Sequence, residues 1–244
     1  MMGDLSSQGR ILGSPRQVNV IRNKNLILDN ISLTINDTDF LGLLGPSGSG
    51  KTTLLKVMSG LIIPDTGKVT YYTSKKPKIG YLPQTLPSLP NSPATVMEII
   101  SSGFNSKPFT NNNEKVISMA KEMAIDHLLD LKITQLSGGQ IQLIFLIRAL
   151  IDSPDIIILD EPSSSIDTKS QSKIFQILTN VNKNLIPVVF SSHDTFAITN
   201  SANRIACINK KLDYHGSSKD FLSNKHLTEA YGYDVDVLSH QGHD

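Results

Sequence analysis

The stretch that decides the fold runs Phe40-Leu41-Gly42-Leu43-Leu44-Gly45-Pro46-Ser47-Gly48-Ser49-Gly50-Lys51-Thr52. Its first five residues predict a buried strand, and apolar residues recur at helical spacing after Lys51, at Leu54, Leu55 and Met58. The loop between strand and helix fits the pattern G-x-x-x-x-G-K-[ST]. In this context backbone N–H groups and the positive end of the helix surround phosphate oxygens. The alternative is a glycine-rich turn that fits by chance, and the flanking strand and helix argue against it.

Two side chains of this loop carry chemistry of their own. Lys51 brings a mobile positive charge to the outer phosphates of a nucleotide, and Thr52 offers its hydroxyl to Mg²⁺. The predicted nucleotide-binding residues are Gly45, Pro46, Ser47, Gly48, Ser49, Gly50, Lys51, Thr52 and Thr53.

A second apolar strand ends in two adjacent acids, in the run Ile156-Ile157-Ile158-Leu159-Asp160-Glu161-Pro162. Successive strand residues point to opposite sides, so one carboxylate can face a metal and the next a bound water. Asp160 is the predicted Mg²⁺ ligand, and Glu161 is the predicted general base or water-orienting group. Taken alone, these acids would be read as a loop or cap. Beside a phosphate loop, the catalytic interpretation is favoured.

The run Leu136-Ser137-Gly138-Gly139-Gln140 predicts another anion-binding helix start, with Ser137 as a hydroxyl donor. The alternative is a plain N-cap, since serine before a helix is common. One phosphate cradle is enough for a nucleotide-binding enzyme. A second cradle therefore suggests that the nucleotide is gripped from both sides.

Alternating strands and helices predict an α/β fold with a mainly parallel sheet covered on both faces. The residue pattern changes at about 85–135. Proline-rich sequence and two helical patterns, at 95–102 and 114–131, predict a small helical lobe inserted in the core. We expect a flexible leader at 1–16, a single domain at 17–235 and a flexible tail at 236–244.

Composition excludes several classes of protein. The 244 residues carry a formal net charge of +1, so no bulk field favours nucleic acid or an anionic membrane surface, and no nucleic-acid partner is expected. A single cysteine, Cys207, excludes an internal disulfide framework and is most simply a buried small hydrophobe in a reducing compartment. The most apolar run, 141–151, is too short to span a bilayer. We therefore expect a cytoplasmic chain that reaches a membrane only through a partner.

From about residue 18 to residue 231 the chain resembles the ATP-binding cassette (ABC) family of ATPases, whose signature motif is the run LSGGQ found here at residues 136–140. The resemblance implies a P-loop NTPase core with an N-terminal antiparallel β portion, and ATP and Mg²⁺ as cofactors. It also implies a head-to-tail dimer with a second copy of the chain. In that dimer Ser137, Gly138, Gly139 and Gln140 contact ATP held by the phosphate loop of the other subunit.

Three further positions match motifs of this family. Gln84, after Ile79-Gly80-Tyr81-Leu82-Pro83, matches the Q-loop glutamine that reaches Mg²⁺ and the attacking water. Asp167 matches the D-loop residue that crosses the dimer interface. His193 matches the switch histidine that contacts the γ-phosphate, although a lone histidine after a strand is more often structural. The resemblance thus implies Glu161, His193 and Gln84 as catalytic residues, and Thr52, Gln84 and Asp160 around Mg²⁺.

Two places depart from the family pattern. Relatives usually carry an aromatic residue that stacks on adenine where this chain has Ile21 and Arg22. An arginine plane can also stack on a base. Beside the signature, Ile141 and Leu143 occupy positions where relatives tend to carry glutamine and arginine, and the helix from Gly139 is apolar almost all round, which predicts deep burial.

A single short cassette without a fused membrane domain looks like the ATPase subunit of a bacterial transporter. Residues 40–56, Ser165-Ile166-Asp167 and the stretch 215–232 resemble zinc- and manganese-type metal importers. This implies integral-membrane permease subunits, an extracytoplasmic solute-binding protein, and a place on the cytoplasmic face of the plasma (inner) membrane. The alternatives are an importer of another small solute, or a non-transport ABC ATPase that gates a soluble partner by ATP-driven dimerisation. A P-loop kinase or GTPase does not account for residues 136–140.

Overall fold

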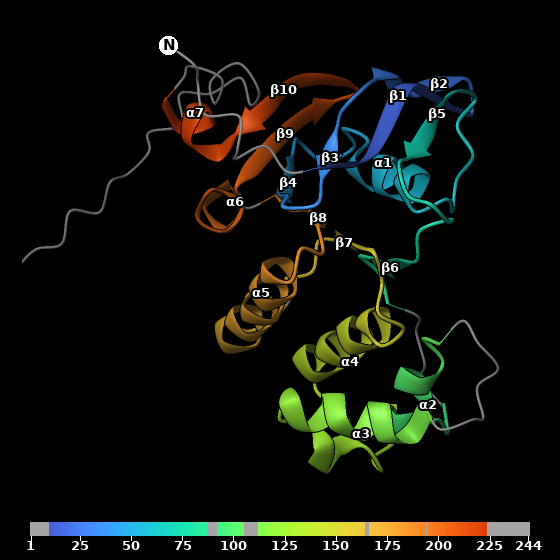
Figure 1. Cartoon of the computed structure of the whole chain (residues 1–244), viewed down its shortest axis with the longest axis vertical. Coiled ribbons are helices and arrows are strands. Elements are labelled where there is room, and N and C mark those ends of the chain that lie inside the picture. The colour runs from blue at the N-terminus through green and yellow to red at the C-terminus, as the bar shows by residue number, and fades with distance from the viewer. Residues whose placement is uncertain (1–9, 87–91, 105–111, 164–165, 194, 224–244) are drawn as a thin grey trace, which may run out of the picture.

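The computed structural model of the chain describes residues 10–86, 92–104, 112–163, 166–193 and 195–223 (Figure 1). The predicted tail at 236–244 and the first part of the predicted leader lie outside these ranges. Among the helices in the described ranges, none combines the length and the hydropathy that crossing a bilayer requires.

A small antiparallel sheet opens the fold and consists of β1 (Ile11–Arg22), β2 (Asn25–Ile31), β3 (Ile35–Asn36) and β5 (Thr66–Tyr71). Strand β1 pairs with each of the other three, so the predicted antiparallel portion is present. The leader predicted at 1–16 is wrong at its C-terminal end, because β1 begins at Ile11. Residues 13–16 pair with β5, and this pairing satisfies their backbone hydrogen-bonding groups. Their Gly-Ser-Pro composition gave no reason to predict a strand.

The main sheet has the strand order β10-β9-β4-β8-β7-β6. The bounds of its strands are β4 Phe40–Leu44, β6 Ile79–Leu82, β7 Ile156–Asp160, β8 Val188–Ser191, β9 Arg204–Asn209 and β10 Lys211–Ser217. All neighbouring pairs run parallel except β9 and β10. The mainly parallel α/β core is therefore confirmed. Parallel strands place their carboxyl ends at one edge of the sheet, and that edge is where the site is built.

Apolar residues cover both faces of this sheet. On β7, Ile156 and Ile158 belong to a core cluster with α1 (Lys51–Met58), whereas Ile157 and Leu159 belong to a second cluster with α4 (Gly138–Leu150) and α5 (Thr168–Lys183). This division follows from the two-residue period of a strand. Near the carboxyl-terminal end of the described chain lie α6 (Thr195–Ser201) and α7 (Ser218–Ser223). Cys207 is buried in β9, as expected.

The helical lobe contains α2 (Val96–Ser101), α3 (Asn112–Glu122) and two 3₁₀ turns, Asp126–Leu128 and Ile133–Gln135. Figure 1 shows α2 and α3 at the far end of the molecule from β1 and β2, with α4 between them and the sheet. The helix predicted at 114–131 is too long. It ends at Glu122, and Ala124 takes a left-handed conformation with φ 51°. The resulting turn brings Ile125, Leu128 and Leu129 into the core.

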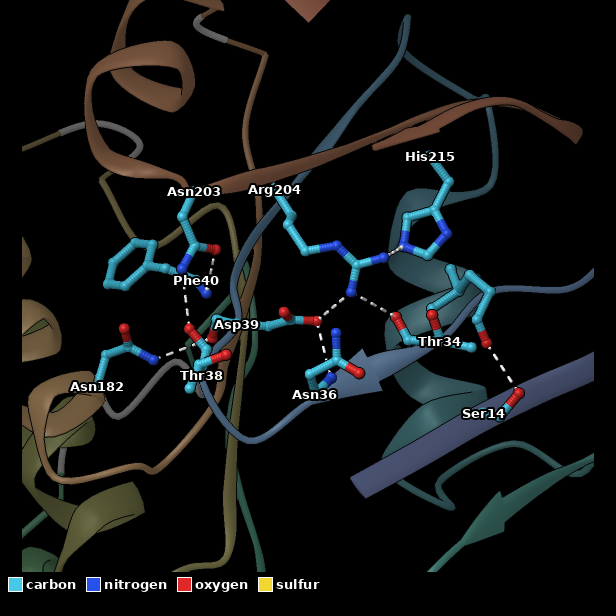
Figure 2. A network of polar contacts seen from close by, with 11 residues as sticks. Ser14, Thr34, Asn36, Thr38, Asp39, Phe40, Asn182, Asn203, Arg204 and His215 are labelled. Carbon is cyan, nitrogen blue, oxygen red and sulfur yellow. Dashed lines mark hydrogen bonds and ion pairs between the residues drawn. The ribbon is translucent and has the colours of Figure 1, made fainter. Parts of the chain in front are cut away.

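A polar network ties the first part of the chain to the last strands (Figure 2). The Arg204 guanidinium on β9 donates to the buried Asp39 carboxylate at 2.6 Å and lies 2.8 Å from His215 Nε2 on β10. Burial raises the pKa of Asp39, against the lowering effect of the Asn36 backbone N–H and of Arg204. Burial, together with the Arg204 charge, lowers the pKa of His215 to about 4. Asn203 adds bonds to the Thr38 carbonyl and from the Phe40 N–H, so the start of β4 is held firmly.

We expect Arg204→Met to lower the free energy of unfolding by about 3 kcal/mol, because removing one partner leaves a buried carboxylate unpaired. Urea unfolding of the full chain measures this. Lys211→Met is the matched control, since it breaks an exposed ion pair with Asp29 and should change the free energy of unfolding by less than about 1 kcal/mol. Equal effects of the two substitutions would contradict the importance given to the network.

Candidate functional site

The predicted residues meet at the carboxyl-terminal edge of the main sheet. Strand β4 leads into the glycine loop, β7 ends at Asp160, and β8 ends two residues before His193. Gln84 follows β6, the next strand beyond β7. The strand order therefore gathers residues that lie more than a hundred positions apart in the sequence.

The glycine loop lies tightly against the strands around it. Gly45 has φ 152°, and a Cβ there would lie 2.1 Å from the Ile208 carbonyl oxygen on β9. Gly50, the N-cap of α1, has φ 103°, and its Cβ would lie 2.6 Å from Leu28 Cδ2 and 2.9 Å from the Ile27 carbonyl oxygen. Only glycine fits this backbone without strain. The loop therefore forms a close backbone cradle at a helix N-terminus, which suits the phosphates of ATP.

Lys51 is buried at the mouth of this cradle. Its ammonium group donates to the carbonyl oxygens of Gly45 at 2.6 Å and Pro46 at 3.1 Å. Burial lowers the pKa of Lys51, while the nearby charges of Glu161 and Asp160 raise it. The Lys51 ammonium group is thus stabilised both by the loop carbonyl oxygens and by the two nearby carboxylates.

Asp160 is the most deeply buried acid of the site, with 1% of its surface exposed. Its Oδ1 accepts hydrogen bonds from the Thr52 hydroxyl at 3.1 Å and the Ser191 hydroxyl at 2.7 Å. Its Oδ2 is buried and has no hydrogen-bond partner among the described residues. A buried carboxylate oxygen without a partner, beside a threonine hydroxyl, is the donor set that Mg²⁺ prefers. The residues present therefore fit a magnesium ion.

Glu161 brings the three predicted catalytic residues together. Its Oε2 accepts from Gln84 Nε2 at 3.0 Å and lies 3.4 Å from His193 Nδ1. The backbone of Glu161 is in the left-handed region with φ 49°, a conformation that costs a non-glycine residue free energy and is common at functional sites. The side chain is 17% exposed, so its carboxylate can reach a bound water.

The glycine loop, Gln84 and Glu161 line one cavity of about 380 Å³. Its walls are Ile27, Ser47, Gly48, Ser49, Gly50, Lys51, Thr52, Thr53, Gln84 and Glu161. The volume is in the range of pockets that hold small ligands. Ile27 was not predicted from the sequence, because nothing in an alternating strand marks which residue will face a loop folded against it.

The signature residues form a separate unit around the start of α4. Ser137 is the N-cap, and its hydroxyl accepts from the Gln140 N–H at 3.3 Å, while Gln140 Oε1 accepts from the Ser137 N–H at 2.9 Å. Gly139 is packed so closely that a Cβ would lie 2.5 Å from Ser170 Oγ. Gly139 and Gln140 line a different cavity of about 630 Å³, together with Asp167. In one chain the signature and the phosphate loop therefore do not meet.

Asp167 stabilises the start of α5. Its carboxylate accepts from the Ser170 N–H at 3.0 Å and the Ser170 hydroxyl at 2.7 Å, and these bonds lower the pKa of Asp167. Because Ser170 is also the residue that crowds Gly139, the start of α5 and the signature are packed together.

The two departures from the family pattern differ in outcome. Leu143 is buried and Ile141 is half-buried in α4, whose apolar residues fill the space between sheet and lobe, so the predicted deep burial is confirmed. Arg22, at the end of β1, donates to the Ile21 carbonyl at 2.8 Å and lies 3.6 Å from Asp65 Oδ2. Neither Ile21 nor Arg22 lines the phosphate cavity.

Two polar residues of the site escaped sequence reasoning. Ser191 bridges the two acids at the end of β8, and Gln142 on α4 is buried and donates to the Pro162 carbonyl at 3.2 Å. A polar residue at the end of an otherwise apolar strand, or inside an apolar helix, was the available signal. Its meaning depended on what packs opposite.

A glycine cradle between β4 and α1, with paired acids at the end of β7, defines a P-loop NTPase. The sequence model of the ABC transporter family matches residues 28–164, and the chain belongs to this family. It is an ATP-hydrolysing enzyme of the ABC transporter type, with ATP and Mg²⁺ as cofactors.

Known proteins show how far the likeness extends. The chain is 34% identical to the zinc import ATP-binding protein ZnuC of Rickettsia conorii over 206 residues, which is 84% of this chain and 86% of that protein. A metal-chelate type ABC transporter solved in an inward-facing conformation superimposes with a TM-score of 0.81, at 26% identity, over 91% of this chain and 90% of that one. A dimeric bacterial ABC transporter cassette has the same fold, with a TM-score of 0.73 at 24% identity over 85% and 99% of the two chains.

We expect Gly50→Ala to weaken ATP binding at least 10-fold, because the new Cβ meets Leu28 and the Ile27 carbonyl and forces the cradle apart. A fluorescent ATP analogue titrated into the full chain measures this. Gly60→Ala is the matched control, since Gly60 also has a positive φ of 76° but nothing within 4 Å of the added Cβ. If both variants bind the analogue like the wild type, the cradle does not set nucleotide affinity.

Proposed function

We propose that this chain is the ATP-hydrolysing subunit of an importer that carries a divalent metal ion, zinc or manganese, through a separate membrane permease. The observation that carries the enzymatic part is the convergence of Gln84 and His193 on the Glu161 carboxylate, beside the phosphate cavity. The metal part is supported by the likeness to the zinc import ATP-binding protein across most of both chains.

In the proposed mechanism Glu161 is the general base or water-orienting group. Gln84 donates to its Oε2 and His193 Nδ1 lies 3.4 Å from the same oxygen, and these contacts limit the rotation of the carboxylate beside the cavity. Lys51 and the loop N–H groups hold the outer phosphates, and His193 reaches the γ-phosphate. Mg²⁺ held by Thr52, Gln84 and Asp160 would supply positive charge against the phosphate oxygens. The remaining residues act by positioning.

We propose a head-to-tail dimer, because in one chain the phosphate loop and the signature lie at different cavities. Each would form one half of a nucleotide site, and a second copy would supply the other half. Ser137 and Gly138 are exposed, and nothing lies within 4 Å of a Cβ placed on Gly138. Asp167 is also exposed beside them. A second copy would place this surface over the phosphate cavity, which Gly48 and Lys51 help to line. The nucleotide would then be enclosed from both sides.

A candidate docking surface for the permease lies where the core meets the lobe. Leu61 is 62% exposed and Ile63 is 86% exposed, just beyond α1. Leu61 lines a cavity of about 280 Å³ with Tyr81 on β6 and Arg148 on α4. A permease segment seated there would touch the core, the lobe and the strand that leads to Gln84. Movement between core and lobe during the ATP cycle would thereby reach the permease.

The same proposal gives the chain its place in the cell. It would bind the cytoplasmic face of the plasma (inner) membrane through the permease, and an extracytoplasmic solute-binding protein would deliver the metal ion from the other side. The domain boundaries at 17–235, moved at the N-terminal end to include β1, describe the part that would form the ATPase.

A strain lacking the chain should lose energy-dependent uptake of radioactive Zn²⁺ or Mn²⁺, and the wild-type gene should restore it. Glu161→Gln should not restore uptake, because removing a general base lowers turnover at least about 100-fold while leaving the phosphate cradle intact. ATP binding by the variant is the control for folding. Unchanged uptake of both metals in the deletion strain would sink the metal proposal, and full activity of Glu161→Gln would sink the role of Glu161.

Leu61→Glu combined with Ile63→Glu should abolish co-purification with the permease while leaving the ATPase activity of the free chain unchanged, because both side chains lie outside the phosphate cavity. Leu185→Glu is the matched control, since Leu185 is also 62% exposed but lies beyond α5. Retention of the double variant on the permease would refute this docking surface.

A further inference from the structure

We propose that Ser191 is a positioning residue whose single hydroxyl holds both acids of the site, fixing the orientation of the Asp160 carboxylate toward the metal and the turn of the Glu161 backbone. This inference rests on the proposed function, because it assigns Ser191 a part in the ATPase cycle. It concerns a residue that is not among those lining the phosphate cavity.

Ser191 is a polar residue at a place that favours apolar ones. It ends β8 after Val188-Val189-Phe190, and it is fully buried, with 0% of its surface exposed. Its strand lies between β4 and β7, and the residues opposite it are Leu43 and Asp160. Burying a hydroxyl is costly unless it is hydrogen-bonded, so its partners account for its presence.

The hydroxyl acts both as a hydrogen-bond donor and as an acceptor toward the paired acids. Ser191 Oγ donates its one hydrogen to Asp160 Oδ1 at 2.7 Å, and it accepts the backbone N–H of Glu161 at 2.9 Å. The bonds run in one direction, from Glu161 N–H through Ser191 to Asp160, so each strengthens the other. One side chain on β8 therefore holds Asp160, the last residue of β7, and Glu161, the first residue of the turn that follows.

For Asp160 the consequence is a fixed carboxylate. Its Oδ1 already accepts from Ser191 and from the Thr52 hydroxyl, and this leaves Oδ2 as the oxygen without a partner among the described residues. Turning the carboxylate out of this plane would break two hydrogen bonds in a buried setting. Ser191 thus helps to fix the orientation of the carboxylate, so that one of its two equivalent oxygens stays available to Mg²⁺.

For Glu161 the consequence is a held backbone. Its φ of 49° is unfavourable for a glutamate, and the conformation persists only where its surroundings impose it. Ser191 holds the Glu161 N–H on one side, and Gln142 holds the Pro162 carbonyl on the other. With the turn fixed in this way, the Glu161 carboxylate reaches Gln84 and His193.

Gln142 offers a way to separate the two effects. It holds the turn after Glu161 but has no bond to Asp160 among those of the described residues. Loss of Gln142 should therefore disturb the catalytic carboxylate alone, whereas loss of Ser191 should disturb the metal ligand and the catalytic carboxylate together.

The test uses the purified full chain and two measurements. The first is the affinity for a fluorescent ATP analogue with and without MgCl₂, and the second is kcat and KM for ATP across a range of Mg²⁺ concentrations. Ser191→Ala should raise the Mg²⁺ concentration needed for half-maximal binding, and should lower kcat, each by about 10- to 100-fold. Its affinity for the analogue without Mg²⁺ should stay at the wild-type value.

Three further variants make the result specific. Ser191→Thr keeps the hydroxyl and should restore both values to within a few-fold of the wild type. Gln142→Leu should lower kcat without changing the Mg²⁺ requirement. Ser59→Ala is the matched control, since the Ser59 hydroxyl donates to the Lys56 carbonyl at the other end of α1, away from both acids. Thermal unfolding reports whether each variant is folded. If Ser191→Thr unfolds, Ser191→Cys replaces it, and its weakly donating thiol should give values between those of alanine and the wild type.

The inference fails if folded Ser191→Ala has the Mg²⁺ requirement and kcat of Ser59→Ala, or if a folded threonine variant restores neither value. A loss of thermal stability without a change in Mg²⁺ dependence also overturns it, because that result assigns Ser191 a structural part only. The proposed function fails separately, if the wild-type chain itself shows neither Mg²⁺-dependent nucleotide binding nor hydrolysis.

Discussion

The hydrogen bonds that surround the buried carboxylate of Asp160 organise the rest of the site. Taking a charge out of water is unfavourable unless polar partners replace the solvent. Here Thr52 comes from the phosphate loop and Ser191 from β8, and both bond the same oxygen. The carboxylate therefore connects β7 to α1 and to the neighbouring strand β8. A small shift of any of these three elements would change the Asp160 carboxylate, the glycine loop and the Glu161 turn together.

Strand β4 transmits a second constraint to the same place. It begins at Phe40, beside the Asp39–Arg204–His215 network, and it ends at Leu44, directly before the glycine loop (Figure 2). Holding one end of a five-residue strand limits the movement of the other, since its backbone is paired on both sides by β8 and β9. The network thus helps to place the cradle from the opposite edge of the sheet, with no group of its own in the cavity.

The arrangement also explains why the signature and the phosphate loop line different cavities. The signature and the start of α5 are locked together by the close approach of Gly139 to Ser170 and by the bonds from Ser170 to Asp167. The phosphate loop belongs to α1, on the other face of the sheet from α4 and α5. Local sequence built each unit correctly, as the Ser137 cap and the Gly50 turn show. The signature and the phosphate loop are separated within one chain because their helices lie on opposite faces of the main sheet.

The sequence by itself determined those features whose conformation depends on neighbouring residues along the chain. Five apolar residues before a glycine loop specify β4, the cradle and α1, and adjacent acids after an apolar run specify the end of β7, because in each case neighbours along the chain decide the conformation. Tertiary structure decided the rest. Residues 11–16 became part of a strand because β3 and β5 supply their pairing partners, and the helix predicted at 114–131 stops at Glu122 because three apolar residues beyond it turn into the core. The link from Ser191 to both acids likewise exists only because β7 and β8 pair in that register. Hydrogen-bond partners distant in sequence leave no local signal, so only the folded chain shows them.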